Sequence, residues 1–365
     1  MKIKVQCPAK INLTLKIVGK RPDGFHNIES IMQTIDLYDY LTIEVKQSDN
    51  FEIILSGNNP EIPYNEKNLV YKAAKLFFDT IFDKNEILRL QRHSEHSALS
   101  EYPALYGSPS RHSERSEESH FAVHLQCRQE SVQNSPQNDK NYKISIYIEK
   151  HIPIAAGLAG GSTDAAGTLY GLNEIFNRPL DKKQLHELCA QLGSDLNVCL
   201  EGGRLMTRGR GEIIEPMPFE EFNLSLIKPK NLGISAKEAY TKFSEKNTHP
   251  LTPSPQGRGN NPIPSLERRV EISDFGVGEK NSTPYREGRG KGVGDRSSFL
   301  NDLEWAIIDD YKELQKIKEL YPNSMMSGSG STYFEIDGNF EPLEGYEVYN
   351  NHKAINFGVK KVPLD

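Results

Sequence analysis

The segment Pro153–Ala166, with the sequence PIAAGLAGGSTDAA, constrains the fold of this chain more than any other stretch. It follows alternating apolar residues that predict a strand ending near Lys150, and it leads into apolar residues at helical spacing. Its glycines, Gly157, Gly160 and Gly161, permit positive φ and close backbone approach. Such a loop gathers free amide N–H groups at the positive end of a helix dipole, which suits phosphate. The segment therefore predicts a phosphate site, and the alternative is a tight strand-to-helix connection that binds nothing.

Two common phosphate-binding loops do not fit this spacing. No Lys-Ser or Lys-Thr pair follows the last glycine, so the segment is not a P-loop, and it lacks the GxGxxG pattern of dinucleotide-binding folds. The polar residues after the last glycine, Ser162, Thr163 and Asp164, are expected to supply the N-cap of the following helix.

Regular patterns stop at two tracts, about 88–140 and about 246–295. The first is rich in Ser, Glu, His, Gln and Arg and contains Arg-His-Ser-Glu twice, whereas the second is rich in Pro and Gly. Neither contains enough apolar residues to offset the entropy of ordering it, so we expect both to be disordered insertions into loops. The histidines of the first tract accompany its repeat and do not indicate a metal site. The Gly-Arg-Gly segments of the second lack the interleaved aromatic residues of RNA binding.

Composition excludes several functions. The net charge of −6 argues against a nucleic-acid binder, which needs a basic excess to displace counterions. No apolar run approaches about eighteen residues, so we expect no membrane span. Met1–Lys10 lacks the apolar core of a secretory signal. The four cysteines are scattered without CxxC spacing, which indicates reduced thiols in a cytoplasmic protein and no zinc site.

Outside the tracts, the patterns predict an α+β chain. The residues Ile11–Ile17 alternate as in a half-buried strand, and GKRPDG at 19–24 is typical of a turn. A single helix is expected over Asp302–Leu320, followed by a glycine loop at Ser327–Thr332. The other predicted elements are strands near Leu41–Val45, Ile144–Ile148, Leu205, Leu224–Lys228 and Tyr333–Ile336, and helices near Asn68–Phe82, Leu180–Leu192 and Ala236–Phe243.

Three further motifs carry polar residues at strand ends or turns, and they are PAKINL at 8–13, DGFH at 23–26 and LGSDL at 192–196. Taken singly, each has a structural interpretation. Lys10 is explained as a solvated strand end, His26 as a turn residue and Asp195 as a helix N-cap.

Taken together and in this order, these motifs and the glycine loop resemble those of the GHMP kinase superfamily, named for galactokinase, homoserine kinase, mevalonate kinase and phosphomevalonate kinase. The resemblance covers nearly all of the chain outside the two tracts. It implies a two-domain α+β GHMP kinase fold with ATP and substrate in the interdomain cleft. The N-terminal ATP-binding domain is expected over 1–215 and the C-terminal domain over 216–365, each interrupted by one tract.

The resemblance also implies roles for individual residues. Lys10 and Asp195 match the catalytic pair, in which the aspartate accepts or orients the hydroxyl proton and the lysine offsets charge on the attacking oxygen. Asn12, Phe25 and His26 match the substrate-binding residues, with Phe25 standing where many members carry tyrosine. The loop that binds ATP in the family matches Pro153, Ile154, Ala155, Ala156, Gly157, Leu158, Ala159, Gly160, Gly161, Ser162 and Thr163.

One departure from the family pattern concerns this loop. Ala155, Ala156 and Ala159 replace glycines that many members carry, and alanine is tolerated wherever φ is negative.

Mg²⁺ is expected to accompany ATP. Since no acidic cage is visible in the sequence, Ser162 and the phosphates are its expected ligands.

The activity implied by the resemblance is ATP-dependent phosphorylation of a methylerythritol hydroxyl on a small-molecule substrate that carries a cytidine diphosphate group. This is a step of non-mevalonate isoprenoid synthesis. Two alternatives stay open: another GHMP kinase, of the homoserine or mevalonate type, and a non-catalytic nucleotide-binding relative. Phe25 and His26 favour the substrate with a cytidine diphosphate group over these alternatives, because a cytidine-recognising pair has no purpose for homoserine or mevalonate. Both a monomer and a homodimer are compatible with the sequence.

Overall fold

The structure is a computed structural model, and it describes residues 1–82, 141–247 and 300–364. The first predicted insertion, about 88–140, lies outside the described residues. The second, about 246–295, does so from residue 248 onward. Lys246, at the expected start of this tract, belongs to a helix and is anchored there. The Lys246 ammonium donates to the Trp305 carbonyl at 2.6 Å and pairs with Asp309 at 2.8 Å.

A seven-stranded sheet forms one half of the molecule, in the order β11-β1-β2-β4-β3, with β5 pairing to β2 and β6 pairing to β5. Only β3 and β4 run parallel; the other pairs are antiparallel. Its strands are β1 (Lys2–Lys20), β2 (His26–Ser48), β3 (Glu52–Gly57), β4 (Asn141–Glu149), β5 (Arg204–Arg208), β6 (Ile213–Pro216) and β11 (Lys360–Val362).

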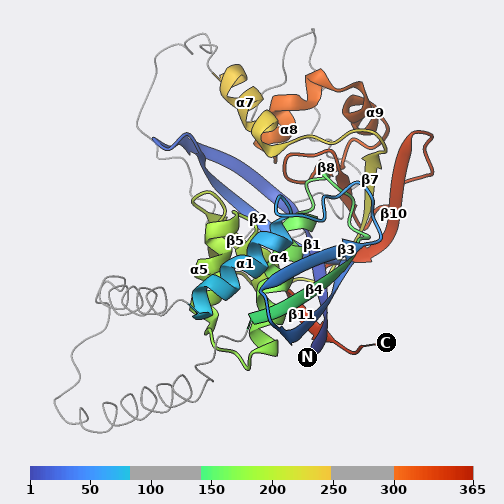
Figure 1. Ribbon diagram of the computed structural model, residues 1–365. Coiled ribbons are helices and arrows are strands. Elements are labelled where there is room, and N and C mark those ends of the chain that lie inside the picture. The colour runs from blue at the N-terminus through green and yellow to red at the C-terminus, as the bar shows by residue number, and fades with distance from the viewer. Residues whose placement is uncertain (83–140, 248–299, 365) are drawn as a thin grey trace, which may run out of the picture.

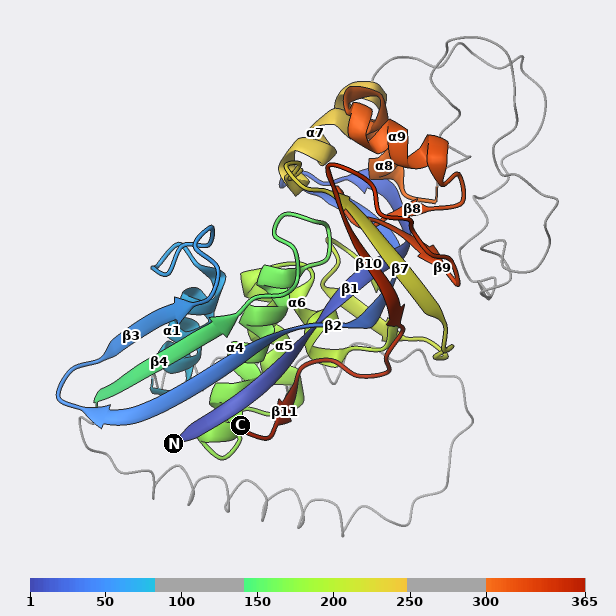
Figure 2. The ribbon, with the colours of Figure 1, turned by 90° about the vertical axis from the view of Figure 1, so that its right-hand side faces the viewer.

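Helices cover one face of this sheet (Figure 2). They are α1 (Leu69–Phe82), α4 (Gly160–Ile175), α5 (Lys182–Leu192) and α6 (Leu196–Glu201). The apolar residues whose spacing predicted α1 form its buried face, which packs with α4 and the strands into one core. Helix α4 approaches β1 very closely at Gly167, where an added Cβ would lie 2.4 Å from the Cys7 sulfur. This close packing fixes the start of α4 relative to the centre of β1.

The other half contains a four-stranded antiparallel sheet in the order β10-β7-β9-β8. Its strands are β7 (Asn223–Pro229), β8 (Met325–Met326), β9 (Tyr333–Ile336) and β10 (Tyr346–Lys353). Three helices lie together beside it at the top of Figure 1, and they are α7 (Ala236–Asn247), α8 (Asp302–Ile307) and α9 (Lys312–Leu320). Their apolar side chains share one core with strands of this sheet.

The helix predicted over Asp302–Leu320 is not continuous. A 3₁₀ turn at Ile308–Asp310 separates α8 from α9, and Tyr311 between them is extended, with φ −127° and ψ 108°. The Gln315 side-chain amide donates to the carbonyls of Ile308 and Asp309, both at 3.1 Å. Since a side chain satisfies these carbonyls, the backbone is free to turn there.

The paired strands β1 and β2 are much longer than the short strands expected, and they run through both halves (Figure 2). Val5 and Leu41 lie in the core of the first sheet, whereas Leu15 and Ile28 lie in the core beneath α8. The expectation of a half-buried strand over Ile11–Ile17 is therefore wrong at its centre. Here the intervening polar residues are also buried, Asn12 being 2% and Thr14 3% exposed, because the strand lies between the two halves.

The C-terminal segment returns to the first sheet. Strand β11 pairs with β1, and Ala354 forms an isolated bridge with Ile35 of β2. The domain boundary at 215/216 stays a prediction. The last described residues of the second predicted domain pack on the first. In the described part of the chain, no helix combines the length and the hydrophobicity that a membrane crossing needs.

Candidate active site

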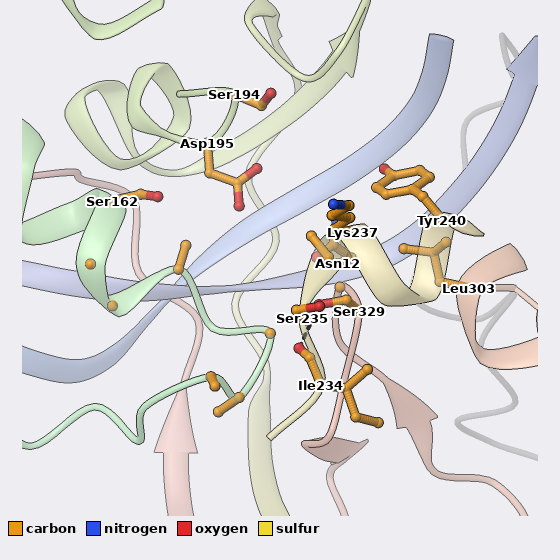
Figure 3. A pocket seen from close by; sticks show the side chains of 18 of the residues that line it. Asn12, Ser162, Ser194, Asp195, Ile234, Ser235, Lys237, Tyr240, Leu303 and Ser329 are labelled. Atoms are coloured by element: carbon orange, nitrogen blue, oxygen red, sulfur yellow. Dashed lines mark hydrogen bonds between the residues drawn. The ribbon is translucent and has the colours of Figure 1, made fainter. Parts of the chain in front are cut away.

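A cavity of about 1140 Å³ lies between the glycine loop, the β1–β2 hairpin and the start of α7. Most of the site residues predicted from the sequence line it: Lys10, Asn12, Phe25, His26, Pro153, Ile154, Ala155, Ala156, Gly157, Ala159, Gly160, Gly161, Ser162 and Asp195. Leu158 and Thr163 do not line it, because their side chains are buried in the protein. Figure 3 shows Asp195 on one side of the cavity and Asn12, Lys237 and Tyr240 across from it.

Lys10 lies at the centre of β1 and is only 3% exposed, so its interpretation as a solvated strand end is wrong. Its ammonium donates to the Asn12 side-chain oxygen at 2.7 Å and to the Gly157 carbonyl at 3.0 Å. The Asp195 carboxylate lies 3.6 Å away. A buried charge requires such partners, and these three bring strand β1, the glycine loop and the α6 turn to one point.

Asp195 occupies the N-cap position of α6, but its side chain makes no capping hydrogen bond. The interpretation as a simple helix cap is therefore wrong. The carboxylate is 30% exposed and faces Lys10 and the cavity. A carboxylate held beside a buried ammonium and open to a cavity is placed to take a proton from a bound hydroxyl.

Helix α4 begins at Gly160, and its N-cap is Ala159, which has no side-chain capping bond. The expectation that Ser162, Thr163 and Asp164 cap the helix is wrong, because all three lie inside it. The first intrahelical bond runs from the Thr163 amide to the Ala159 carbonyl at 2.9 Å. The first amides of a helix have no carbonyl partner within the helix, and those of α4 lie where the loop lines the cavity. This arrangement supports the predicted phosphate site.

Two residues of the same loop have a strained backbone conformation. Ala155 has φ 49° and Ala159 has φ 59°, so these two alanines do not lie at the negative φ at which alanine is readily tolerated. Each left-handed alanine costs about 1 kcal/mol. Gly157, at φ 75°, has no substitute, because an added Cβ would lie 2.1 Å from the Ser327 carbonyl oxygen. The Ser327 hydroxyl donates to the Gly157 carbonyl at 3.0 Å, so the second glycine loop braces the first.

A buried ion cluster lies beneath the start of α4. The Lys150 ammonium pairs with Asp39 and, at 2.9 Å, with Asp164. Asp39 also accepts the backbone amides of His151, at 2.6 Å, and Ile152, at 2.9 Å. Burial raises the pKa of Asp164 to about 7, although Lys150 opposes the shift. The cluster fixes the strand end, β2 and the first helical turn together. Sequence reasoning missed it because Asp164 had been assigned to the cap.

At the other end of the cavity, His26 is held by residues from α7. Its ring stacks on Tyr240 with centroids 5.2 Å apart and planes 14° apart, and its Nε2 lies 3.1 Å from the Ser244 hydroxyl. Burial, with the nearby Lys20, lowers the pKa of His26 below its ordinary value. Phe25 is 53% exposed and lines the cavity. Tyr240 was missed because one aromatic residue in a short amphipathic helix carries no functional signal.

The segment before α1 forms the remaining wall, which sequence reasoning also missed. Ile62, Pro63 and Leu69 line the cavity beside the glycine loop. Asn68 holds this segment, since its side-chain nitrogen donates to the Pro63 carbonyl at 2.8 Å and its oxygen caps the Val70 amide at 2.9 Å. The result is an apolar wall next to the predicted phosphate site.

The cavity is positively charged although the chain carries a net charge of −6. Six basic residues line it against two acidic ones, Asp164 and Asp195. The basic residues are Lys10, Lys20, Lys67, Lys150, Lys237 and Arg210. Such a charge balance suits polyanionic ligands. Within the described residues, no group of three or more His, Cys, Asp or Glu side chains forms a ready metal site.

Comparison with known proteins agrees with this geometry. Residues 124–203 match the family model described as the GHMP kinases N terminal domain. A 4-diphosphocytidyl-2-C-methyl-D-erythritol kinase of Clostridium tetani is 36% identical over 253 residues, which are 68% of this chain and 69% of the relative. The kinase of the same name from Clostridium perfringens is 32% identical over 362 residues, which are 96% of each chain.

Solved structures show the same fold. A crystal structure of 4-(cytidine 5′-diphospho)-2C-methyl-D-erythritol kinase has a TM-score of 0.58 and 20% identity, covering 97% of this chain and 99% of the other. A homoserine kinase from Cytophaga hutchinsonii has a TM-score of 0.52 and 13% identity, covering 99% and 97%. The predicted α+β GHMP kinase fold is confirmed. By its sequence relatives, the chain belongs to the 4-diphosphocytidyl-2-C-methyl-D-erythritol kinase family of GHMP kinases.

Proposed function

We propose that this chain transfers the γ-phosphoryl group of ATP to a hydroxyl of 4-diphosphocytidyl-2-C-methyl-D-erythritol and produces the 2-phosphate, in non-mevalonate isoprenoid synthesis. Family membership supports the activity. The observation that carries the site assignment is the 3.6 Å approach of Lys10 to Asp195 within the cavity that the start of α4 lines. A catalytic pair and a phosphate-binding helix start then face one space, as phosphoryl transfer requires.

ATP would bind with its phosphates at the start of α4. The uncapped amides around Gly160 and Gly161 offer donors for phosphate oxygens, and the helix dipole adds favourable potential. The adenine ring would lie against the apolar wall of Ile62, Pro63 and Leu69. A bound Mg²⁺ would be held by phosphate oxygens and the Ser162 hydroxyl, and it would neutralise charge on the triphosphate.

The acceptor would bind at the opposite end of the cavity. Phe25 presents an exposed ring on which a pyrimidine base can stack. His26, oriented by Tyr240 and Ser244, supplies ring nitrogens for hydrogen bonds to the base. Asn12 is held by Lys10 and by the Ser30 hydroxyl at 2.8 Å, next to where the reacting hydroxyl would lie.

In the reaction, the acceptor oxygen attacks the γ-phosphorus as the bond to the β–γ bridging oxygen breaks. The hydroxyl proton passes to the Asp195 carboxylate, and ADP leaves with the bridging oxygen. Lys10 lies between Asp195 and the glycine loop, so its charge stabilises the oxygen that becomes negative. All the residues named belong to one chain, so this chemistry is compatible with either a monomer or a homodimer.

The fold alone does not choose the acceptor, since the homoserine kinase shares it. The aromatic end formed by Phe25, His26 and Tyr240 favours a substrate with a planar base. The test is the rate of ADP release from ATP with the cytidylyl substrate, homoserine or mevalonate as acceptor. Turnover of homoserine or mevalonate in preference to the cytidylyl substrate would overturn the proposal. Tight ATP binding without turnover of any acceptor would identify a non-catalytic relative.

A further inference from the structure

The turn between β5 and β6 connects the acceptor end of the cavity to the segment that carries Asp195. The Ile28 amide at the start of β2 donates to the Gly209 carbonyl at 2.8 Å. On the other side, the Asn197 side chain of α6 donates to the Glu212 carbonyl at 2.7 Å. Gly211, at φ 119°, approaches Ser194 so closely that an added Cβ would lie 3.3 Å from the Ser194 Cβ. The turn is therefore docked on both sides.

Arg210 lies at the tip of this turn and lines the cavity. Its guanidinium carbon is 5.3 Å from the centroid of the Phe25 ring, which is the distance of a cation–π contact. One terminal nitrogen donates to the Ala190 carbonyl of α5 at 3.3 Å, and Nε lies 3.6 Å from a Glu212 carboxylate oxygen. The Arg210 amide donates to the same carboxylate at 2.6 Å. Both the backbone and the guanidinium plane are thus held from outside the cavity.

Phe25 needs a support of this kind. Its ring is 53% exposed, and its amide is held by the Asp23 carboxylate at 3.1 Å, which itself pairs with Arg21. These contacts hold the backbone of Phe25 and do not involve its ring. A planar guanidinium can lie against an aromatic face and limit rotation of the ring, which a lysine ammonium does less well.

We propose that Arg210 is a substrate-positioning residue that holds the Phe25 ring ready to stack on the pyrimidine base of the acceptor. This inference rests on the proposed function and adds a specificity element from outside the Lys10–Asp195 pair and the glycine loop. Because the same turn is docked on the Ser194–Asp195 segment, the position of the base is linked to the position of the catalytic carboxylate.

The test compares Arg210→Gln and Arg210→Lys with Arg208→Gln. Arg208 lies in the same hairpin, but it pairs with Glu215 at 2.7 Å and is 42% exposed, so its variant serves as the matched control. From the usual strength of a cation–π contact, Arg210→Gln should raise KM for the cytidylyl substrate roughly 2- to 30-fold with KM for ATP unchanged. Arg210→Lys should give a smaller rise, and Arg208→Gln none.

A double-mutant cycle with Phe25→Leu separates positioning from a general structural effect. In the Phe25→Leu background, Arg210→Gln should add little to KM, because the ring it supports is gone. Fully additive effects would overturn the inference, as would an equal rise in KM for ATP. Calorimetric binding of cytidine 5′-diphosphate to the same variants measures the contact between Phe25 and the base without requiring turnover. A wild-type protein that binds this nucleotide but transfers no phosphate would refute the proposed function alone, whereas one that does not bind it would refute both.

Discussion

Replacing Asp195 with alanine should separate phosphoryl transfer from ATP binding, because the carboxylate pairs with Lys10 whereas the proposed phosphate donors are amides at the start of α4. Its ion pair with Lys10, at 3.6 Å, would be worth about 5 kcal/mol at an effective dielectric constant of 20. Asp195 is 30% exposed, so solvent screening reduces this to about 1 kcal/mol of stability. Lys10 keeps its bonds to Asn12 and Gly157, so the variant should remain folded.

The expected effect on catalysis is much larger than the effect on stability. Loss of a positioned general base lowers kcat by roughly 10²- to 10⁴-fold, which corresponds to about 3–5 kcal/mol of transition-state stabilisation. The Kd for ATP should change less than about two-fold, since the donors around Gly160 are untouched. The assay is ADP release under saturating ATP and cytidylyl substrate, combined with calorimetric ATP binding.

A matched control is available in the same part of the chain. Asp181 caps α5 through a reciprocal bond with Gln184, so Asp181→Ala should cost about 1 kcal/mol of stability and leave kcat unchanged. Near-normal kcat in Asp195→Ala, or a parallel loss of ATP binding, would refute the role assigned to this carboxylate.

Three further outcomes are expected. In Gly157→Ala the new Cβ would lie 2.1 Å from the Ser327 carbonyl oxygen, at φ 75°, so the free energy of unfolding in urea should fall by roughly 1–3 kcal/mol. Gly161 has no neighbour within 4 Å of an added Cβ, so Gly161→Ala should lower it by less than about 1 kcal/mol. Burial raises the pKa of Asp164 to about 7, so this group contributes stability at acidic pH that is lost as pH rises from about 4 to 7. Asp164→Asn should flatten this loss when urea unfolding is measured between pH 4 and pH 8, and an unchanged slope would contradict the assignment. Ser162→Ala should raise the Mg²⁺ concentration for half-maximal activity roughly 5- to 10-fold, as expected for one lost polar contact of about 1 kcal/mol; an unchanged Mg²⁺ dependence would exclude the hydroxyl as a ligand.

Local patterns in the sequence were enough to locate the strand, glycine loop and helix of the proposed phosphate site. Glycine spacing and helical periodicity depend on neighbouring residues, so they indicated the order of these elements. They did not give the exact start of α4, because the cap is Ala159 and not one of the residues Ser162–Asp164. The proximity of Lys10 and Asp195 could not be predicted from local patterns. It came from the family resemblance, because no local pattern relates two residues so far apart in the chain.

The features that were missed depend on tertiary contacts. Tyr240 reaches His26 from the other half of the molecule, and Arg210 reaches Phe25 from a distant hairpin. The left-handed conformation of Ala159 runs against the preference of alanine itself, so residue type did not indicate it. The burial of Asn12 was hidden for a related reason, since a period-two pattern shows alternation but does not reveal that both faces of a strand are covered.

The continuity of β1 and β2 through both cores has a mechanical consequence. In a kinase whose halves are joined by a flexible linker, a hinge can open and admit ligands. Here such a rotation would have to bend two long paired strands whose side chains are packed at both ends. We therefore expect ligands to enter the cavity through small local movements, and the two halves to melt in a single cooperative step.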